Sequence, residues 1–199
     1  MPPANVGRLI LVRHGESEGN RDRTFTRTPE VPLTETGHRQ ARAAGELIRR
    51  EFAAARVVAS PFRRAQQTAA AIAAVLGLDV DTEPDLRERD FGVYVGRPYD
   101  SVLADPAFDP ARRWEWRPDE GESLTEVYDR VVPAIERVAA QGAGRDVVVV
   151  SHGGVMLALS AFFARSWEGL SVARNCGILV VEHEDGKYGP LRTIEDEYV

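Results

Sequence analysis

A run of four valines late in the chain limits its possible folds more than any other feature. Val147–Val150 carries no polar side chain, and neighbouring side chains in a strand point to opposite faces. A strand that is apolar on both faces must be covered on both, as in the centre of a parallel sheet. The run therefore predicts a central parallel strand over Asp146–Ser151, with helices above and below it.

Short apolar segments alternate with amphipathic ones along the rest of the chain. Thr34 or Thr36 can cap the first helix, Gly77 can end the second, and Pro133 should kink the third or cost it a hydrogen bond. Asp185-Gly186 predicts a type I′ hairpin. This alternation predicts an α/β fold, a three-layer α/β/α sandwich around a mostly parallel sheet. The predicted strands are Arg8–Val12, Val57–Ala59, Leu78–Thr82, Asp146–Ser151, Ile178–His183 and Leu191–Ile194, and the predicted helices are Thr36–Phe52, Arg64–Leu76, Ser123–Gln141 and Gly153–Ala164.

The chain length of 199 residues favours one domain over residues 1–199. Residues 93–120 are rich in proline, contain Trp114 and Trp116, and lack a helical or strand period. We expect this segment to form an irregular insertion over one edge of the core. The sequence leaves the oligomeric state open.

Charge and cysteine content exclude several classes of function. The net charge of −6 argues against a binder of nucleic acid or of anionic membranes, which is usually basic. A lone cysteine, Cys176, excludes a disulfide framework and a zinc site with two Cys ligands. No signal peptide or long apolar span is visible. We therefore expect a cytoplasmic protein without membrane contact, in which a small anion could still bind a local cluster of cations.

Two histidines follow predicted buried strands and precede glycine. His14 comes after Arg8–Val12 and His152 after the valine run. Ligands of α/β sheets bind beyond the carboxyl ends of the strands, so both rings are predicted at one edge. Arg13, and Arg63 or Arg64, also stand at strand ends, where a buried guanidinium needs an anion such as a carboxylate or a bound phosphate. Turn histidines with satisfied rings are the structural alternative.

Other chemical signals are weaker. Gly15-Glu16-Ser17-Glu18-Gly19 matches the spelling of a serine nucleophile elbow, but a polar loop follows where that motif needs a helix. Glu88 lies in a charged stretch that would ordinarily be solvated. No dinucleotide, Walker or His-Glu-x-x-His motif is present.

Short motifs from Leu11 to Gly154 together resemble a known family. Arg13-His14-Gly15-Glu16-Ser17 with Asn20 looks like the signature of the histidine phosphatase (phosphoglycerate mutase-like) superfamily. The further matching motifs are Pro32-Leu33-Thr34 with Gly37 and Gln40-Ala41, Ser60-Pro61 with Arg64-Ala65 and Thr68-Ala69, Leu86 with Glu88 and Phe91-Gly92, Gly121-Glu122-Ser123, and Val150-Ser151-His152-Gly153-Gly154.

The resemblance implies a role for each matching residue. His14 would be the nucleophile that forms a phosphohistidine, and Glu88 the proton donor. The resemblance selects Arg64 over Arg63, and implies that Arg13, Arg64 and His152 bind the transferring phosphoryl group. His152 would do this best when protonated, and a bound anion favours that charge. Asn20 and Gly153 would contact the phosphate, and Thr26, beside an Arg27 where relatives often have Gly, would contact the substrate. No metal or other cofactor is implied, and the partner would be a small phosphorylated metabolite.

The family contains both phosphatases and mutases. A short segment after Glu88, Phe91 where mutases have tyrosine, and Gly121-Glu122-Ser123 favour the broad-specificity phosphatase branch. The opposing feature is a set of arginines that could bind a second anionic group: Arg112, Arg113 and Arg117. A phosphoglycerate or other phosphosugar mutase is thus the alternative activity. A non-catalytic phosphate-binding module is a further alternative, which the intact set of matching residues disfavours.

Overall fold

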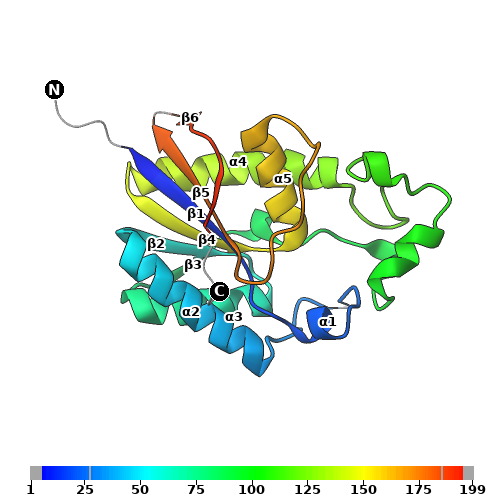
Figure 1. The fold of residues 1–199 in the computed structure, drawn as a ribbon, viewed down its shortest axis with the longest axis horizontal. Coiled ribbons are helices and arrows are strands. Elements are labelled where there is room, and N and C mark those ends of the chain that lie inside the picture. The colour runs from blue at the N-terminus through cyan, green and yellow to red at the C-terminus, as the bar shows by residue number, and fades with distance from the viewer. Residues whose placement is uncertain (1–5, 27, 185, 195–199) are drawn as a thin grey trace.

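The computed structural model describes residues 6–26, 28–184 and 186–194. Within them, a seven-stranded sheet has the order β3-β2-β4-β1-β5-β6, and β7 also pairs with β5. Helices cover both of its faces (Figure 1). The predicted three-layer α/β class is therefore confirmed. The strands are β1 (Gly7–Arg13), β2 (Ala54–Ala59), β3 (Val80–Thr82), β4 (Asp146–Ser151), β5 (Ile178–Glu184), β6 (Lys187–Tyr188) and β7 (Arg192–Ile194).

The valine strand β4 lies at the centre of the sheet, as predicted. It is parallel to both neighbours, β1 and β2, and all six of its residues are buried. β3 extends the parallel part beyond β2, whereas β5 runs antiparallel to β1. The carboxyl ends of β1, β2 and β4 consequently meet at one edge of the sheet.

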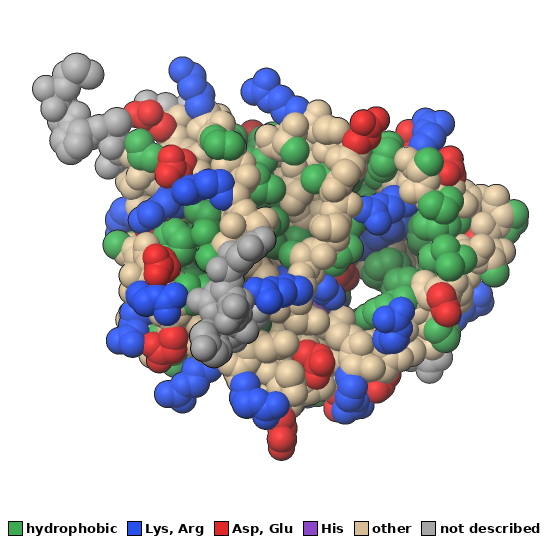
Figure 2. All heavy atoms as spheres, in the orientation of Figure 1, with side chains coloured by type: hydrophobic (Ala, Val, Ile, Leu, Met, Phe, Trp, Pro, Cys, Tyr) green, Lys and Arg blue, Asp and Glu red, His purple; other side chains and the backbone are tan. Residues whose placement is uncertain are grey.

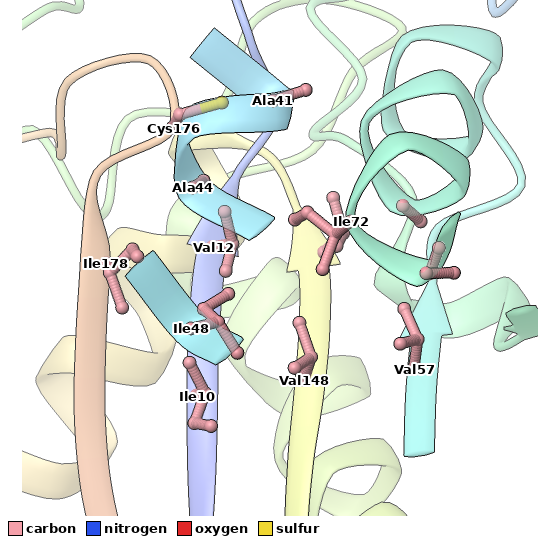
Figure 3. Packing of buried hydrophobic residues seen from close by; sticks show 14 of the residues in the cluster. Ile10, Val12, Ala41, Ala44, Ile48, Val57, Ile72, Val148, Cys176 and Ile178 are labelled. Atoms are coloured by element: carbon pink, nitrogen blue, oxygen red, sulfur yellow. The ribbon is translucent and has the colours of Figure 1, made fainter. Parts of the chain in front are cut away.

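Two apolar clusters, one on each face, form the core. Helices α2 (Glu35–Glu51) and α3 (Arg63–Leu76) cover one face, and α4 (Leu124–Gly142) and α5 (Gly153–Ala164) the other (Figure 1). Along β1, Ile10 and Val12 pack toward Ile48 and Ile72 of the first pair (Figure 3). The alternate residues of the same strand, including Leu9, belong to the cluster under α4 and α5. One apolar strand thus supplies both cores.

The predicted helix boundaries agree with the structure to within one residue. Thr34 caps α2 by accepting a hydrogen bond from the backbone N–H of Gly37, and Gly77 ends α3 at a φ of 70°. Ser123 forms a capping box with Glu126 at the start of α4. That helix continues through Pro133, so the proline does not end it.

The structure differs from the predicted strand bounds by one residue at β1, β5 and β7 and by more at β2 and β3, where β3 begins at Val80, two residues later than predicted. β2 begins at Ala54, earlier than predicted, because its first half is only partly buried and lacks an apolar run. β6 was not predicted, and β7 begins one residue later than expected. The predicted type I′ turn includes Asp185, which lies outside the described residues, as does Arg27 beside the predicted substrate contact Thr26.

The segment after Glu88 lies beyond the carboxyl ends of the strands (Figure 1). It contains three 3₁₀ turns: η2 (Gly92–Tyr94), η3 (Tyr99–Ala104) and η4 (Pro110–Arg112). The backbone N–H of Phe25 donates to the carbonyl of Arg97 at 2.9 Å, and Gly96 donates to Phe25 at 2.7 Å. These bonds join the segment to the loop after the short helix α1 (Glu18–Arg21), and the two together wall the sheet edge. None of the described helices is both long and apolar enough to cross a membrane.

Candidate active site

His14 and His152 lie side by side at the sheet edge. Arg13 and Ser151 are paired residues of the parallel strands β1 and β4, and the backbone N–H of His14 donates to the Ser151 carbonyl at 2.8 Å. The centroids of the two imidazole rings are 5.1 Å apart. The neighbourhood predicted from the strand ends is therefore present.

The hydrogen bonds of His14 fix its tautomer. Nδ1 lies 2.7 Å from the Gly15 carbonyl, which can only accept, so Nδ1 carries the proton. Nε2 accepts a hydrogen bond from Nε of Arg64 at 3.2 Å, so it holds a lone pair. Burial, followed by the charges of Arg64 and Arg13, keeps the pKa of His14 well below its ordinary value. His14 is thus a neutral imidazole with Nε2 able to act as a nucleophile.

Three buried nitrogens beside His14 have no hydrogen-bond partner among the described residues: Nε of Arg13, Nη1 of Arg64 and Nδ1 of His152. Arg13 is anchored by a 2.7 Å bond from Nη1 to the Ala173 carbonyl, and His152 by a 2.7 Å contact between Nε2 and the Ser60 hydroxyl. Buried nitrogens that remain unpaired cost free energy. This cluster is therefore suited to binding an anion that is small enough to reach all three.

Burial lowers the pKa of both guanidinium groups, Arg13 and Arg64, from their ordinary values, although the carboxylate of Glu88 opposes this. His152 is also buried, and its burial, with the nearby Arg64, His14 and Arg13, holds its pKa well below the ordinary range. In the free site His152 is consequently neutral. The protonated form expected from the sequence requires the charge of a bound anion.

Glu88 reaches this cluster from the segment after β3. Its Oε1 accepts hydrogen bonds from the backbone N–H groups of Arg89 at 2.8 Å and Gly154 at 3.1 Å. Gly154 lies in the first turn of α5, where the helix dipole favours a carboxylate. A Cβ at position 154 would lie 2.7 Å from Oε1 of Glu88. Glycine at that position therefore allows the carboxylate to approach the helix.

Arg130 of α4 holds the Glu88 segment in place. Its guanidinium donates to the carbonyls of Asp85 at 2.6 Å, Arg87 at 3.0 Å and Glu88 at 3.2 Å. The same group forms an ion pair with Glu122 at 2.9 Å. Glu122 of the Gly121-Glu122-Ser123 motif thus acts on the site through Arg130. Sequence reasoning did not identify Arg130, because an arginine on an amphipathic helix ordinarily faces solvent.

Asn20, Thr26 and Gly153 line the same cavity. The Asn20 carbonyl oxygen accepts from the Ser17 hydroxyl and from Nδ2 of Asn175, both at 3.0 Å, and its Nδ2 donates to the Tyr99 hydroxyl at 3.1 Å. Ser17 caps α1 in a capping box with Asn20. A short helix therefore follows Ser17 where a polar loop was predicted, and the Ser17 hydroxyl is engaged as the cap of that helix, which argues against the serine-elbow interpretation.

Asn175 is a site residue that the sequence patterns did not indicate. Besides its bond to Asn20, Nδ2 donates to the carbonyl of His14 at 3.0 Å. Asn175 precedes β5, and Val12 pairs with Ile178 across the antiparallel β1–β5 pair. The residues before β5 therefore meet the end of β1. Knowing that β5 runs antiparallel to β1 would have located Asn175. The apolar pattern of the sequence does not reveal the direction of a strand.

Arg13, His14 and Arg64 line a cavity of about 440 Å³ and form its floor, and His152 lies buried behind His14. Figure 2 shows the molecule hollowed between the core and the segment after Glu88, with hydrophobic side chains in the hollow. Of the three insertion arginines, Arg113 lines this cavity, whereas Arg112 pairs with Glu115 at 2.6 Å and Arg117 with Glu126 at 3.2 Å. The described residues include no cluster of three His, Cys, Asp or Glu side chains positioned to bind a metal.

The model of the histidine phosphatase superfamily (branch 1) matches residues 9–196. The chain belongs to the histidine phosphatase superfamily. The resemblance inferred from the motifs around His14, Arg64, Glu88 and His152 is thereby confirmed at the level of the superfamily.

Relatives within the histidine phosphatase superfamily include both mutases and phosphatases by name. The chain is 37% identical over 157 residues to phosphoglycerate mutase-like protein 4 of Arabidopsis thaliana, covering 76% of this chain and 68% of that one. It is 31% identical over 194 residues to a probable phosphoglycerate mutase of Yersinia pestis, covering 90% and 86% of the two chains. A mycobacterial glucosyl-3-phosphoglycerate phosphatase solved with VO3 matches with a TM-score of 0.80 at 29% identity, covering 95% of this chain and 98% of that one.

Proposed function

We propose that the chain is a phosphomonoester hydrolase of the broad-specificity phosphatase branch, acting without a metal through a phosphohistidine on His14. The observation that carries the proposal is the cluster of unpaired nitrogens of Arg13, Arg64 and His152 around the unprotonated Nε2 of His14. A phosphoryl group has three non-bridging oxygens that such donors can bind, and it accepts a nucleophile on the face opposite its leaving group.

In the first step, the lone pair of Nε2 on His14 attacks phosphorus and a P–N bond forms. The bond between phosphorus and the ester oxygen breaks, and that oxygen takes a proton from Glu88. Arg13, Arg64 and His152 stabilise the charge on the non-bridging oxygens in the transition state. Asn20 and Gly153 contribute phosphate contacts, and Thr26 contacts the substrate.

In the second step, water replaces the histidine. Glu88, now a carboxylate, takes a proton from the water while its oxygen attacks phosphorus. The P–N bond breaks, inorganic phosphate forms, and His14 regains the neutral tautomer in which Nδ1 donates to the Gly15 carbonyl. The cycle needs no group beyond these side chains and water.

A phosphoglycerate mutase is the second candidate, favoured by the names of the relatives from Arabidopsis and Yersinia. Binding of a second anionic group would call for free cations on the cavity wall. Arg112 pairs with Glu115 and Arg117 pairs with Glu126 of α4, which favours hydrolysis over transfer between two positions of a phosphosugar. A binding module would not need a donor such as Glu88.

The test is a hydrolysis assay on a panel of phosphate esters with and without EDTA, alongside conversion of 3- to 2-phosphoglycerate. We expect phosphate release that EDTA does not reduce, and mutase turnover at least about 100-fold slower. Rapid mutase turnover would show that the alternative is right. Loss of hydrolysis in EDTA, restored by a divalent ion, would remove the metal-independent part of the proposal.

The protonation of His14 gives a prediction about pH. Because its pKa lies well below the ordinary value, the ring should stay neutral as the pH falls from 8 to about 6.5. NMR titration of the imidazole Cε1–H resonances measures this directly, with His14→Gln assigning the signal. A midpoint at or above about 6.5 in the free protein would disagree with a neutral nucleophile. Bound inorganic phosphate should raise the midpoint of His152, since an anion favours the charged ring.

A further inference from the structure

The walls of the cavity are mainly aromatic, whereas its floor carries the cationic side chains. The walls are the part of the cavity that the leaving alcohol of a substrate would contact. Resting on the hydrolase proposed above, we propose that the preferred substrates are phosphate monoesters whose alcohol carries an apolar group of aromatic size. Five aromatic side chains line the cavity above the phosphate-binding floor: Phe25, Phe91, Tyr99, Phe108 and Trp116.

These rings form a continuous wall. The ring centroid of Phe25 lies 4.2 Å from that of Phe91 and 5.0 Å from that of Tyr99. Arg89 bridges the next gap, with its guanidinium carbon 5.3 Å from the centre of Phe91 and 4.9 Å from that of Trp116. Such packing holds each ring in one orientation, so the wall exists before a ligand binds.

Hydrogen bonds already occupy the polar tips of the aromatic wall. Nε1 of Trp116 donates to Asp105 at 3.1 Å, and the hydroxyl of Tyr99 donates to the Gly19 carbonyl at 3.3 Å while accepting from Asn20. These groups are therefore committed to the protein. What remains for a ligand is ring surface, which favours apolar over hydroxylated alcohols.

The two arginines on the wall are likewise tied to the backbone. Arg89 donates to the carbonyls of Glu122 at 2.6 Å and Trp116 at 2.7 Å, and Arg113 donates to the Leu170 carbonyl. Burial lowers the pKa of Arg89 to about 10. Their bonds join the segment after Glu88 to its neighbours, so both side chains serve first to hold the wall.

Apolar surface also lies exposed to solvent at the edge of the cavity. Val172, which also lines it, is 46% exposed. Exposed aliphatic side chains beside an aromatic cavity extend its apolar surface toward solvent. An apolar substituent can thus lie along the wall while the phosphate occupies the floor.

The test compares esters whose leaving alcohols have similar acidity, so that chemistry differs little among them. Phosphate release from 2-phenylethyl phosphate, ethyl phosphate, glycerol 3-phosphate and 3-phosphoglycerate is measured. We expect kcat/KM for the phenylethyl ester to exceed the other three by about 30-fold or more. In Phe108→Ala this preference over ethyl phosphate should fall about five- to tenfold, whereas Phe52→Ala, a half-buried ring outside the cavity, should keep it.

The outcomes separate this inference from the proposed hydrolase. Hydrolysis of all four esters at similar kcat/KM, or a preference for 3-phosphoglycerate, would overturn the substrate class and leave the hydrolase in place. Absence of phosphate release from every ester would overturn both. A preference that survives Phe108→Ala unchanged would show that the aromatic wall does not produce it.

Discussion

Replacing His14 by alanine should lower kcat/KM for phosphate-ester hydrolysis by about 10⁴- to 10⁶-fold. The variant loses the nitrogen that forms the covalent intermediate, and the remaining cations can only bind the phosphate. Arg64 also loses the acceptor for its Nε, which now bonds Nε2 of His14 at 3.2 Å. The matched control is His38→Ala, the same change on an exposed residue of α2, which should retain activity within about twofold.

The covalent intermediate gives this prediction a second measurement. Rapid acid-free quenching of wild-type protein with ³²P-labelled ester should trap a label that is labile to acid and stable to alkali, as expected for a P–N bond. His14→Ala should trap none. A label stable to acid and labile to alkali would instead indicate Ser17 and revive the serine interpretation.

Replacing Glu88 by glutamine should slow turnover of an alkyl phosphate by about 10²- to 10⁴-fold. The amide retains an oxygen that can accept from the N–H groups of Arg89 and Gly154, so the side chain can keep its place but no longer exchanges a proton. The affinity for inorganic phosphate should change little. Glu46→Gln, on the exposed surface of α2, is the matched control and should have no effect.

The leaving group sharpens the role of Glu88. A nitrophenolate can leave without being protonated, whereas an alkoxide needs a proton to leave. In Glu88→Gln, the rate of His14 phosphorylation should therefore fall far less with 4-nitrophenyl phosphate than with an alkyl phosphate. Measured burst rates for the two esters separate that step from hydrolysis of the intermediate. An equal loss in both burst rates, or an equal loss of phosphate affinity, would argue that Glu88 positions other groups and does not donate a proton.

The sequence predicted the sheet centre and the helices well because burial imposes their patterns. The valines of β4 indicate that both faces of that strand are buried, and the three- to four-residue apolar spacing in α2 and α4 indicates which helix face is buried. The partly buried first half of β2 and the two-residue β6 lack such a pattern, so the start of β2 and the whole of β6 were not predicted. The direction of β5 depends on long-range pairing, and this hid Asn175.

The candidate site shows the same division. The ends of two adjacent buried strands located His14 and His152, and the family motifs added Arg64 and Glu88. Contacts between separate irregular segments could not be predicted from the sequence. They depend on the path of the backbone and leave no periodic pattern of apolar residues. Arg130 on the carbonyls around Glu88 and the aromatic wall are the main examples.

The unpaired nitrogens also bear on the energetics of folding. Nε of Arg13, Nη1 of Arg64 and Nδ1 of His152 are buried without a hydrogen-bond partner among the described residues, so the folded protein carries a locally unfavourable region at the candidate site. A bound anion relieves that penalty only in the native state and so raises the free energy of unfolding. Protein stability and ligand affinity are therefore coupled at this site. An apolar residue at position 64 would remove the penalty of the unpaired Arg64 nitrogen, and it would remove the proposed activity as well.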